Sequence, residues 1–344
     1  MPFKIPTLWF GMLHQSIAGH PDPISKHPSC RRLMPARNLP SQCDGGLWTA
    51  ELHNARVIAN ARLIALDDGR VIAGLQSLHG TPRGLTTRTF RRIRLLNRRV
   101  LSGVSLMLGA PCGDNYFHWL FDCLPRLKIC FECGVDLKNV QHILLDGHVN
   151  RNLVRDTFEI LELPFEKVVY LNNREIVQCE ELTLPSMTVP SPGEVANWIV
   201  EWLRETFAGQ HSTPPIPPTR KLFIAREPST SRRLINRDLV QNQLESLGFE
   251  THYLRGKKIT EQVSLFRSAK IVVAQHGAAL TNLSFCEPGT KLVEIISPGH
   301  SNRCYADLAA VHGIERKELF GQPCDDKSGL DITVNIPELT RMVQ

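Results

Sequence analysis

The stretch from Lys270 to Ser297 reads KIVVAQHGAALTNLSFCEPGTKLVEIIS, and it predicts the fold of the chain around it. An apolar run, Ile271–Ala274, leads into a turn of small residues, His276–Ala279, and residues 280–286 follow at helical spacing. After a Glu-Pro-Gly turn, a second apolar run covers 292–296. A strand, a tight turn, a helix start and a second strand form half of a nucleotide-binding α/β unit.

The turn after the first of these strands is a candidate phosphate site. It would place the backbone N–H groups of Ala278, Ala279 and Leu280 at the head of a helix, where unpaired donors and the helix dipole favour an anion. Gly277 leaves room for a ligand to reach the backbone. The alternative is an ordinary turn whose small residues only let the helix pack tightly on the sheet.

Length and composition indicate a soluble globular protein with room for two domains. The chain has 344 residues, of which 42% are hydrophobic and 22% charged, with a net charge of +6. That charge is too mild to indicate nucleic-acid binding and suits a small anionic substrate. The densest basic run, 88–99, is interpreted as a solvated or domain-facing segment.

The cysteines and the N-terminus indicate a reducing compartment. Cys130 and Cys133 form one C-x-x-C with no second pair, at a helix end and not at a helix start, so we expect structural thiols. The N-terminus resembles neither a signal peptide nor a membrane anchor, and no run approaches about 18 apolar residues. We therefore expect a cytoplasmic protein, for which peripheral association with a membrane surface stays open.

Turn signals and periodicity divide the chain into five segments. These are an irregular N-terminal segment (1–46), a first α/β domain with a flanking hairpin (47–208), a proline-rich linker (209–219), a second α/β domain (220–322) and a tail (323–344). Within the tail, 336–343 is expected to form a helix that could return to the first domain. Alternation of strands and helices in both domains predicts parallel sheets that face a central cleft.

Three arginines lie just past an apolar strand predicted at 221–225. Arg226, Arg232 and Arg233 share one polar loop, and guanidinium groups there can bind a diphosphate through paired hydrogen bonds. The alternative is ordinary surface charge.

A second candidate site lies at the start of a helix that Asp114 or Asn115 would cap. His118 and Asp122 are four residues apart and share a helix face, so the carboxylate can hold one imidazole nitrogen and leave the other as a general base. The alternative is a buried histidine that its neighbour satisfies.

Glu294 interrupts the apolar run 292–296, where a carboxylate is costly unless it is paired. It could bind ribose or sugar hydroxyls, or it could hold an arginine. The sequence has no D-x-D, H-E-x-x-H, G-x-S-x-G or Walker A motif, so we expect no catalytic metal. It also lacks the G-x-G-x-x-G of dinucleotide-binding enzymes.

Three stretches together resemble glycosyltransferase family 61, also labelled DUF563. They are NYFHWLFDCLPRL at Asn115–Leu127, LFIAREPSTSRRLINRD at Leu222–Asp238 and VAQHGAALTNLSFCEPGTKLVEI at Val273–Ile295. The resemblance implies a GT-B-like pair of Rossmann-like domains and an inverting sugar transfer from a nucleotide-diphosphate donor, expected to be a UDP-sugar, with no other cofactor. Because no leader or anchor is evident, the chain resembles a bacterial, cytosolic member of the capsular or exopolysaccharide type.

The resemblance also implies roles for individual residues. His118 or Asp122 would be the catalytic base, and Asn115 would lie on the acceptor side. The donor-binding residues that it implies would be Arg226, Arg232, Arg233, Gly277, Ala278, Ala279 and Asn282. His276 in the same turn and Glu294 in the apolar run complete our set of donor-binding candidates. The rival functions are a non-catalytic scaffold for polysaccharide assembly and a Rossmann-type enzyme that modifies nucleotide sugars.

Overall fold

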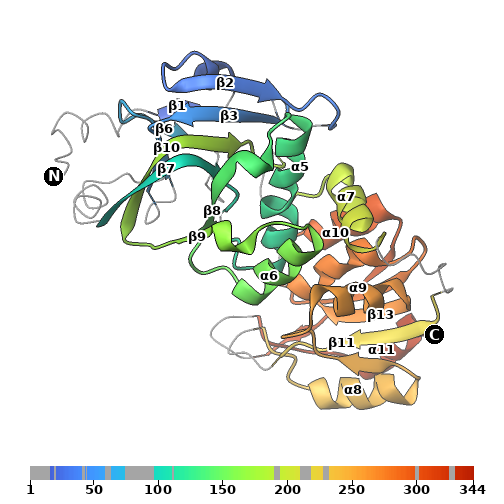
Figure 1. The fold of residues 1–344 in the computed structure, drawn as a ribbon. Coiled ribbons are helices and arrows are strands. Elements are labelled where there is room, and N and C mark those ends of the chain that lie inside the picture. The colour runs from blue at the N-terminus through green and yellow to red at the C-terminus, as the bar shows by residue number, and fades with distance from the viewer. Residues whose placement is uncertain are drawn as a thin grey trace. The chain divides into compact units, whose positions relative to one another are not determined.

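The computed structural model forms two compact units, Met1–Pro192 and Gly193–Gln344 (Figure 1). The described residues are 16–18, 21–40, 43, 45–58, 63–73, 97–110, 112–189, 194–209, 218–227, 232–298, 302–324 and 330–344. Most of the basic run 88–99 and most of the proline-rich linker 209–219 lie outside them. Among the described residues, no helix combines the length and the apolar character needed to span a membrane.

The first unit is built on one mixed sheet, in which β7, β8, β9 and β10 are parallel neighbours and most of the other pairings are antiparallel. Its strands are β1 (Ser16–Ala18), β2 (Cys30–Pro35), β3 (Trp48–His53), β4 (Arg56–Ile58), β5 (Leu63–Ala65), β6 (Val71–Ala73), β7 (Asn97–Met107), β8 (Val140–Asp146), β9 (Val168–Leu171) and β10 (Glu175–Pro185). The predicted parallel sheet is therefore only part of this unit, because hairpins from the N-terminal third add antiparallel strands to it.

The N-terminal segment contributes to this sheet. Strand β2 pairs with β3, and β3 pairs with β10, so the prediction that 1–46 is irregular is wrong for Cys30–Pro35, and also for Ser16–Ala18, which pairs with β6. The signal was weak because the adjacent residues Arg31 and Arg32 of β2 are both exposed, which breaks the alternation expected of a strand. Asn54, with φ of 52°, bends the chain between β3 and β4, and both strands pair with β10.

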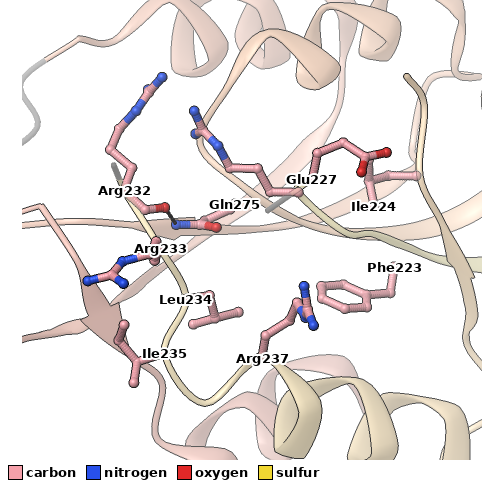
Figure 2. A pocket seen from close by; sticks show the side chains of 10 residues that line it. Phe223, Ile224, Glu227, Arg232, Arg233, Leu234, Ile235, Arg237 and Gln275 are labelled. Carbon is pink, nitrogen blue, oxygen red and sulfur yellow. Dashed lines mark hydrogen bonds between the residues drawn. The ribbon is translucent and has the colours of Figure 1, made fainter. Parts of the chain in front are cut away.

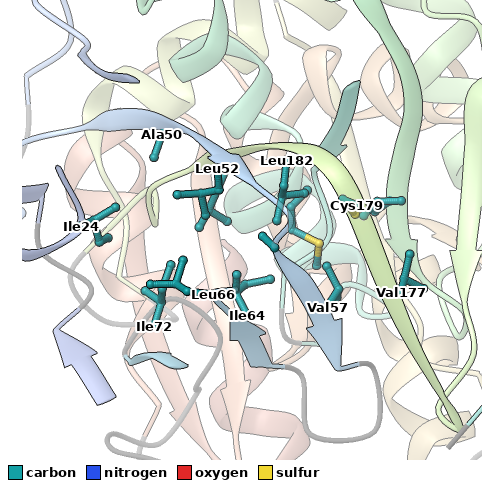
Figure 3. Packing of buried hydrophobic residues seen from close by; sticks show 14 of the residues in the cluster. Ile24, Ala50, Leu52, Val57, Ile64, Leu66, Ile72, Val177, Cys179 and Leu182 are labelled. Atoms are coloured by element: carbon teal, nitrogen blue, oxygen red, sulfur yellow. The ribbon is translucent and has the colours of Figure 1, made fainter. Parts of the chain in front are cut away.

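The bend encloses a hydrophobic cluster between the hairpins and the sheet. Figure 3 shows Leu52 and Leu182 gathered with Ile64, Leu66 and other side chains of this cluster. These side chains are almost completely buried, and each contributes about 1.5–3 kcal/mol of hydrophobic stabilisation. The cluster anchors the antiparallel part of the sheet.

The helices of the first unit lie mostly in the connections between its parallel strands, and the first of them, α2, precedes β2. They are α2 (Pro21–Ser25), α4 (Tyr116–His118), the π-helical η1 (Trp119–Cys123), α5 (Pro125–Glu132), the 3₁₀ turns η2 (Leu137–Asn139) and η3 (Phe165–Lys167), and α6 (Arg151–Ile160). As predicted, the helix that begins after Asn115 restarts at Pro125, because proline has no N–H to continue the ladder.

The second unit holds a parallel five-stranded sheet in the order β12-β11-β13-β14-β15. Its elements are α7 (Asn197–Phe207), β11 (Arg220–Ile224), α8 (Arg237–Ser246), β12 (Glu250–His252), α9 (Ile259–Arg267), β13 (Ala269–Gln275), η4 (Ala278–Phe285), β14 (Lys291–Ile296), α10 (Cys304–His312), β15 (Glu315–Phe320), β16 (Gln322–Pro323), β17 (Ile332–Thr333) and α11 (Ile336–Val343). The alternation of strand and helix confirms the Rossmann-like prediction for this part of the chain.

The strand order reverses direction between β11 and β13. From β11 the chain crosses to β12 on one side, then returns past β11 to β13 on the other, so α8 and α9 cover opposite faces of the sheet (Figure 1). A crevice forms at the carboxyl ends of two strands where the connections diverge in this way, and such crevices are the usual ligand sites of open α/β sheets.

Two predicted boundaries are corrected. Helix α7 belongs to the second unit, because Phe207 packs edge-to-face on Phe285 and Arg204 donates to the Cys286 carbonyl; the division therefore precedes α7 and not the linker. The tail helix α11 packs against α8 and buries Leu339 in the core of the second unit, so it does not return to the first.

Candidate functional site

A pocket of about 330 Å³ opens at the carboxyl edge of the parallel sheet, at the point where the strand order reverses. Its walls come from the chain directly after β11, β12 and β13. They consist of Ile224, Ala225, Arg226, Glu227, Leu254, Arg255, Gln275, Gly277, Ala278 and Ala279. The pocket therefore occupies the position that the strand order favours for a ligand.

The turn after β13 differs from the predicted helix start. The segment that follows Gly277 is 3₁₀-helical, and the Leu280 N–H donates to the Gly277 carbonyl at 2.9 Å. That donor is therefore used within the turn, and the candidate anion-binding N–H groups are those of Ala278 and Ala279, which line the pocket. Gly277 itself is extended, with φ of 165°, so close approach and not backbone strain is the reason for a glycine here.

Arg226 lies directly against this turn. Its Nη1 donates to the His276 carbonyl at 3.4 Å and is 3.4 Å from the position that a Gly277 Cβ would take. Burial lowers the pKa of the Arg226 guanidinium, the nearby charge of Arg232 lowers it further, and Tyr305 opposes this effect. Among the described residues, Arg226 and Arg232 share no carboxylate, and two neighbouring guanidinium groups of this kind leave positive potential that a bound anion would relieve.

The other two arginines of the loop have different surroundings. Gln275 Nε2 donates to the Arg232 carbonyl at 2.8 Å, which holds Arg232 in a left-handed conformation with φ of 55°. Arg233 forms an ion pair with the buried Asp331 through Nε at 2.6 Å. Figure 2 shows the Arg232 side chain directed away from that of Arg233, so only Arg233 is anchored toward β17.

A second pocket of about 280 Å³ adjoins the first and shares Ile224, Arg226, Glu227 and Gln275 with it (Figure 2). Its remaining wall is formed by Phe223, Arg232, Arg233, Leu234, Ile235 and Arg237. The arginine-containing loop after β11 therefore borders both pockets.

Two predicted donor-binding residues are buried beneath the turn. Asn282 is fully buried and donates to Gln262 Oε1 and to the Ala279 carbonyl, so it fastens the turn to α9. Glu294 is also fully buried, and its two oxygens accept from His276 Nδ1 and Arg316 Nε, each at 2.5 Å. Of the two uses considered for Glu294, the structure shows that it holds an arginine.

In the first unit, Asn115 caps the helix that carries the second candidate site. Its Oδ1 accepts from the Phe117 N–H at 2.9 Å. A π-helical turn follows, in which the Leu124 N–H donates to the Trp119 carbonyl. Such single π-helical turns are frequent at functional sites.

His118 and Asp122 form the hydrogen-bonded pair that their spacing predicts. Nδ1 of His118 donates to Oδ2 of Asp122 at 2.5 Å; the carboxylate is buried, whereas the imidazole keeps 19% of its side-chain surface exposed. Within the described part of the chain, Asp122 Oδ1 has no hydrogen-bond partner. Burial lowers the pKa of Arg126, one turn further on, and the Asp122 charge partly offsets that effect. A carboxylate behind an imidazole fixes the tautomer and leaves Nε2 to accept a proton.

One group of three candidate metal ligands occurs among the described residues, namely His27, Asp67 and Asp68. Its atoms already bond within the protein, because His27 Nε2 contacts Asp68 Oδ2 at 2.9 Å and Arg70 Nε contacts the same carboxylate at 2.6 Å. We interpret this group as a structural network at the turn between β5 and β6.

The sequence that forms these two candidate sites is similar to known glycosyltransferases. The family Glycosyltransferase 61 matches residues 116–293, which run from α4 to β14 and include the His118–Asp122 pair, Arg226 and the Gly277 turn. The chain belongs to glycosyltransferase family 61. It is also 34% identical over 104 residues to the xylan glycosyltransferase MUCI21 of Arabidopsis thaliana, a match that covers 29% of this chain and 18% of that protein.

Sequence reasoning missed several pocket residues of this family 61 protein. Leu254 and Arg255 follow β12, Gln275 ends β13, and Glu227 follows Arg226. Only their position in the sequence could have identified them, because residues just past the carboxyl ends of parallel strands share one edge of the sheet. The short strand β12 made that end difficult to locate from the sequence.

Because Arg226 lies close to Gly277, a larger side chain at position 277 should disturb the guanidinium. If the pocket binds UDP, Gly277→Val should weaken that binding about tenfold, since its added methyl groups would displace the Arg226 guanidinium. The free energy of unfolding should change by no more than about 1 kcal/mol, because the backbone is extended there. Calorimetric titration with UDP and thermal unfolding measure the two effects. Gly277→Ala should give a smaller loss, and equal UDP affinity for all three proteins would contradict the prediction that the Gly277 turn and Arg226 bind an anion.

Proposed function

We propose that this family 61 protein is an inverting glycosyltransferase that moves a sugar from a nucleoside-diphosphate donor to a hydroxyl group of a glycan. The observation that carries the proposal is Arg226, whose half-buried guanidinium lies against the Gly277 turn without an ion pair to any described carboxylate. A cation in that environment is stabilised when a diphosphate occupies the pocket.

The donor would occupy the pocket of about 330 Å³ in the following way. Arg226 and Arg232, with the N–H groups of Ala278 and Ala279, would bind the diphosphate. The nucleoside would then extend toward the wall formed by Leu254 and Arg255. A uridine donor is our first choice, and the volume suits one nucleotide and not a longer polymer.

The chemical step needs a base and a stabilised leaving group. The acceptor hydroxyl is far too weak an acid to ionise alone, so His118 Nε2 would take its proton as the hydroxyl oxygen bonds to the anomeric carbon. Asp122 would hold the opposite edge of the ring and stabilise the imidazolium that forms. The bond from the anomeric carbon to the phosphate oxygen breaks on the opposite face, which inverts the configuration.

Charge accumulates on the departing phosphate as that bond breaks. The guanidinium groups and backbone donors of the second unit would stabilise it, a role that a metal ion fills in other transferases. We therefore propose a metal-independent reaction. In this proposal the second unit holds the donor and the first unit supplies the base, so the reaction requires His118 to reach the bound sugar.

The acceptor is proposed to be a polysaccharide or oligosaccharide. The partial relative is named as a xylan glycosyltransferase, which supports a glycan acceptor for the family 61 region. The earlier resemblance points to the capsular or exopolysaccharide class.

A nucleotide screen tests the proposal. UDP at about 100 times its dissociation constant should stabilise the protein by about 2.7 kcal/mol, which thermal unfolding detects as a raised melting temperature. GDP, CMP and NAD serve as comparisons. Stabilisation by NAD alone would indicate a nucleotide-sugar-modifying oxidoreductase, and no response to any nucleotide would favour a scaffold.

A further inference from the structure

Three charged or polar side chains form a continuous hydrogen-bonded chain across the sheet of the second unit. His276 follows β13, Glu294 lies in β14 and Arg316 lies in β15, so the three come from adjacent strands. The His276 Nδ1 and Arg316 Nε atoms each lie 2.5 Å from an oxygen of Glu294. The chain thus leads from the edge strand of the sheet to the donor pocket.

The carboxylate of Glu294 is paired on both sides. Glu294 is fully buried, where an unpaired carboxylate would be strongly unfavourable, and both of its oxygens are occupied. Burial tends to lower the pKa of Arg316, but the charges and hydrogen bonds of Glu294 and Glu318 outweigh burial and raise it. An ionised Glu294 accepts hydrogen bonds only, so His276 Nδ1 is the donor of that contact.

His276 is the junction between this buried chain and the pocket. The backbone N–H of His276 donates to the Ile295 carbonyl at 2.8 Å, and the His276 carbonyl accepts from Arg226 Nη1 at 3.4 Å. The ring of Tyr305 packs against the imidazole, with 4.9 Å between the two ring centroids. The contacts of the imidazole with Glu294 and Tyr305 therefore hold in place the residue whose carbonyl Arg226 contacts and which Gly277 follows.

We propose that Glu294 and Arg316 are positioning residues for diphosphate binding: they orient His276, which in turn sets the Gly277 turn and the Arg226 guanidinium. This inference deepens the proposed function and rests on it. Arg316 would act across two strands, because its contact with Glu294 fixes the carboxylate that holds His276. Neither positioning residue would touch the donor.

Binding of inorganic pyrophosphate tests the inference without assuming a nucleobase. Calorimetric titration should show affinity about tenfold weaker for Arg316→Met and for Glu294→Gln than for the unchanged protein. Arg316→Lys should recover most of the loss, because it restores the charge next to Glu294. The matched control is Glu318→Gln, which removes the solvent-side partner of Arg316 at 2.7 Å and leaves the chain intact. Its affinity should not change.

Two further measurements separate positioning from simple loss of structure. Uridine has no phosphate, so its affinity should be the same in Arg316→Met as in the unchanged protein; equal weakening of uridine and pyrophosphate overturns the inference. Unfolding temperatures check each variant, and Arg316→Met tests the chain even if Glu294→Gln does not fold. If the unchanged protein binds neither pyrophosphate nor a nucleoside diphosphate, the proposed function itself fails. If it binds pyrophosphate and Arg316→Met binds equally well, only the positioning role fails.

Discussion

His118→Ala is expected to lower turnover about 10²–10⁴-fold, the range that a general base usually contributes. The affinity for UDP should stay nearly constant, because the proposed donor contacts all belong to the second unit. The imidazole is suited to this role because Asp122 holds Nδ1 at 2.5 Å while the ring stays partly exposed. Turnover measured at saturating donor, with UDP affinity measured separately, distinguishes a catalytic role from a binding role.

Asp122→Asn should lower turnover about 10²-fold or more, because a neutral amide neither fixes the tautomer nor stabilises the imidazolium. Its melting temperature should change little, since one oxygen of the buried Asp122 has no described hydrogen-bond partner to lose. Lost activity with unchanged or raised stability is typical of a functional residue.

His142→Ala provides the matched control for the pair. His142 is a histidine of the same unit whose Nε2 contacts the Ser102 carbonyl at 3.1 Å, and its removal should leave turnover unchanged. If His118→Ala keeps full turnover, or if UDP affinity falls as much as turnover, His118 is not the base.

Local signals explain why much of the fold could be predicted from the sequence. The apolar runs of β13 and β14, the cap at Asn115 and the restart at Pro125 all depend on residues close together in the chain. The His118–Asp122 contact is equally local, since four-residue spacing brings both side chains to one face.

Contacts between distant segments could not be predicted in this way. The pairing of β2 with β3 depends on cross-strand packing that weak periodicity does not reveal. The partner of Arg233 is Asp331, 98 residues away, and nothing near either residue identifies the other. The loop arginines therefore looked equivalent in the sequence, although the structure separates one that is anchored by a carboxylate from one that lies against the Gly277 turn.

Arg226→Ala should reduce turnover about 10²–10³-fold, as expected for a group that stabilises charge on the leaving diphosphate. UDP affinity should fall with it, because the same guanidinium contacts the diphosphate before and during the reaction. Arg226→Lys should recover only part of the loss, since an ammonium group keeps the charge but not the paired hydrogen bonds of a guanidinium. Initial rates and calorimetric titration with UDP measure the two effects.

The control for Arg226 is Arg220→Gln, at the opposite end of the same strand. Arg220 pairs with the exposed Glu250, and a surface pair of this kind contributes about 1 kcal/mol or less. Both variants lower the net charge equally, so a general loss of electrostatic attraction would weaken UDP binding in both. A loss confined to Arg226→Ala supports a direct contact at the Gly277 turn. If Arg226→Ala instead binds UDP like the unchanged protein, the diphosphate must bind elsewhere in the second unit, and the proposed donor orientation is wrong.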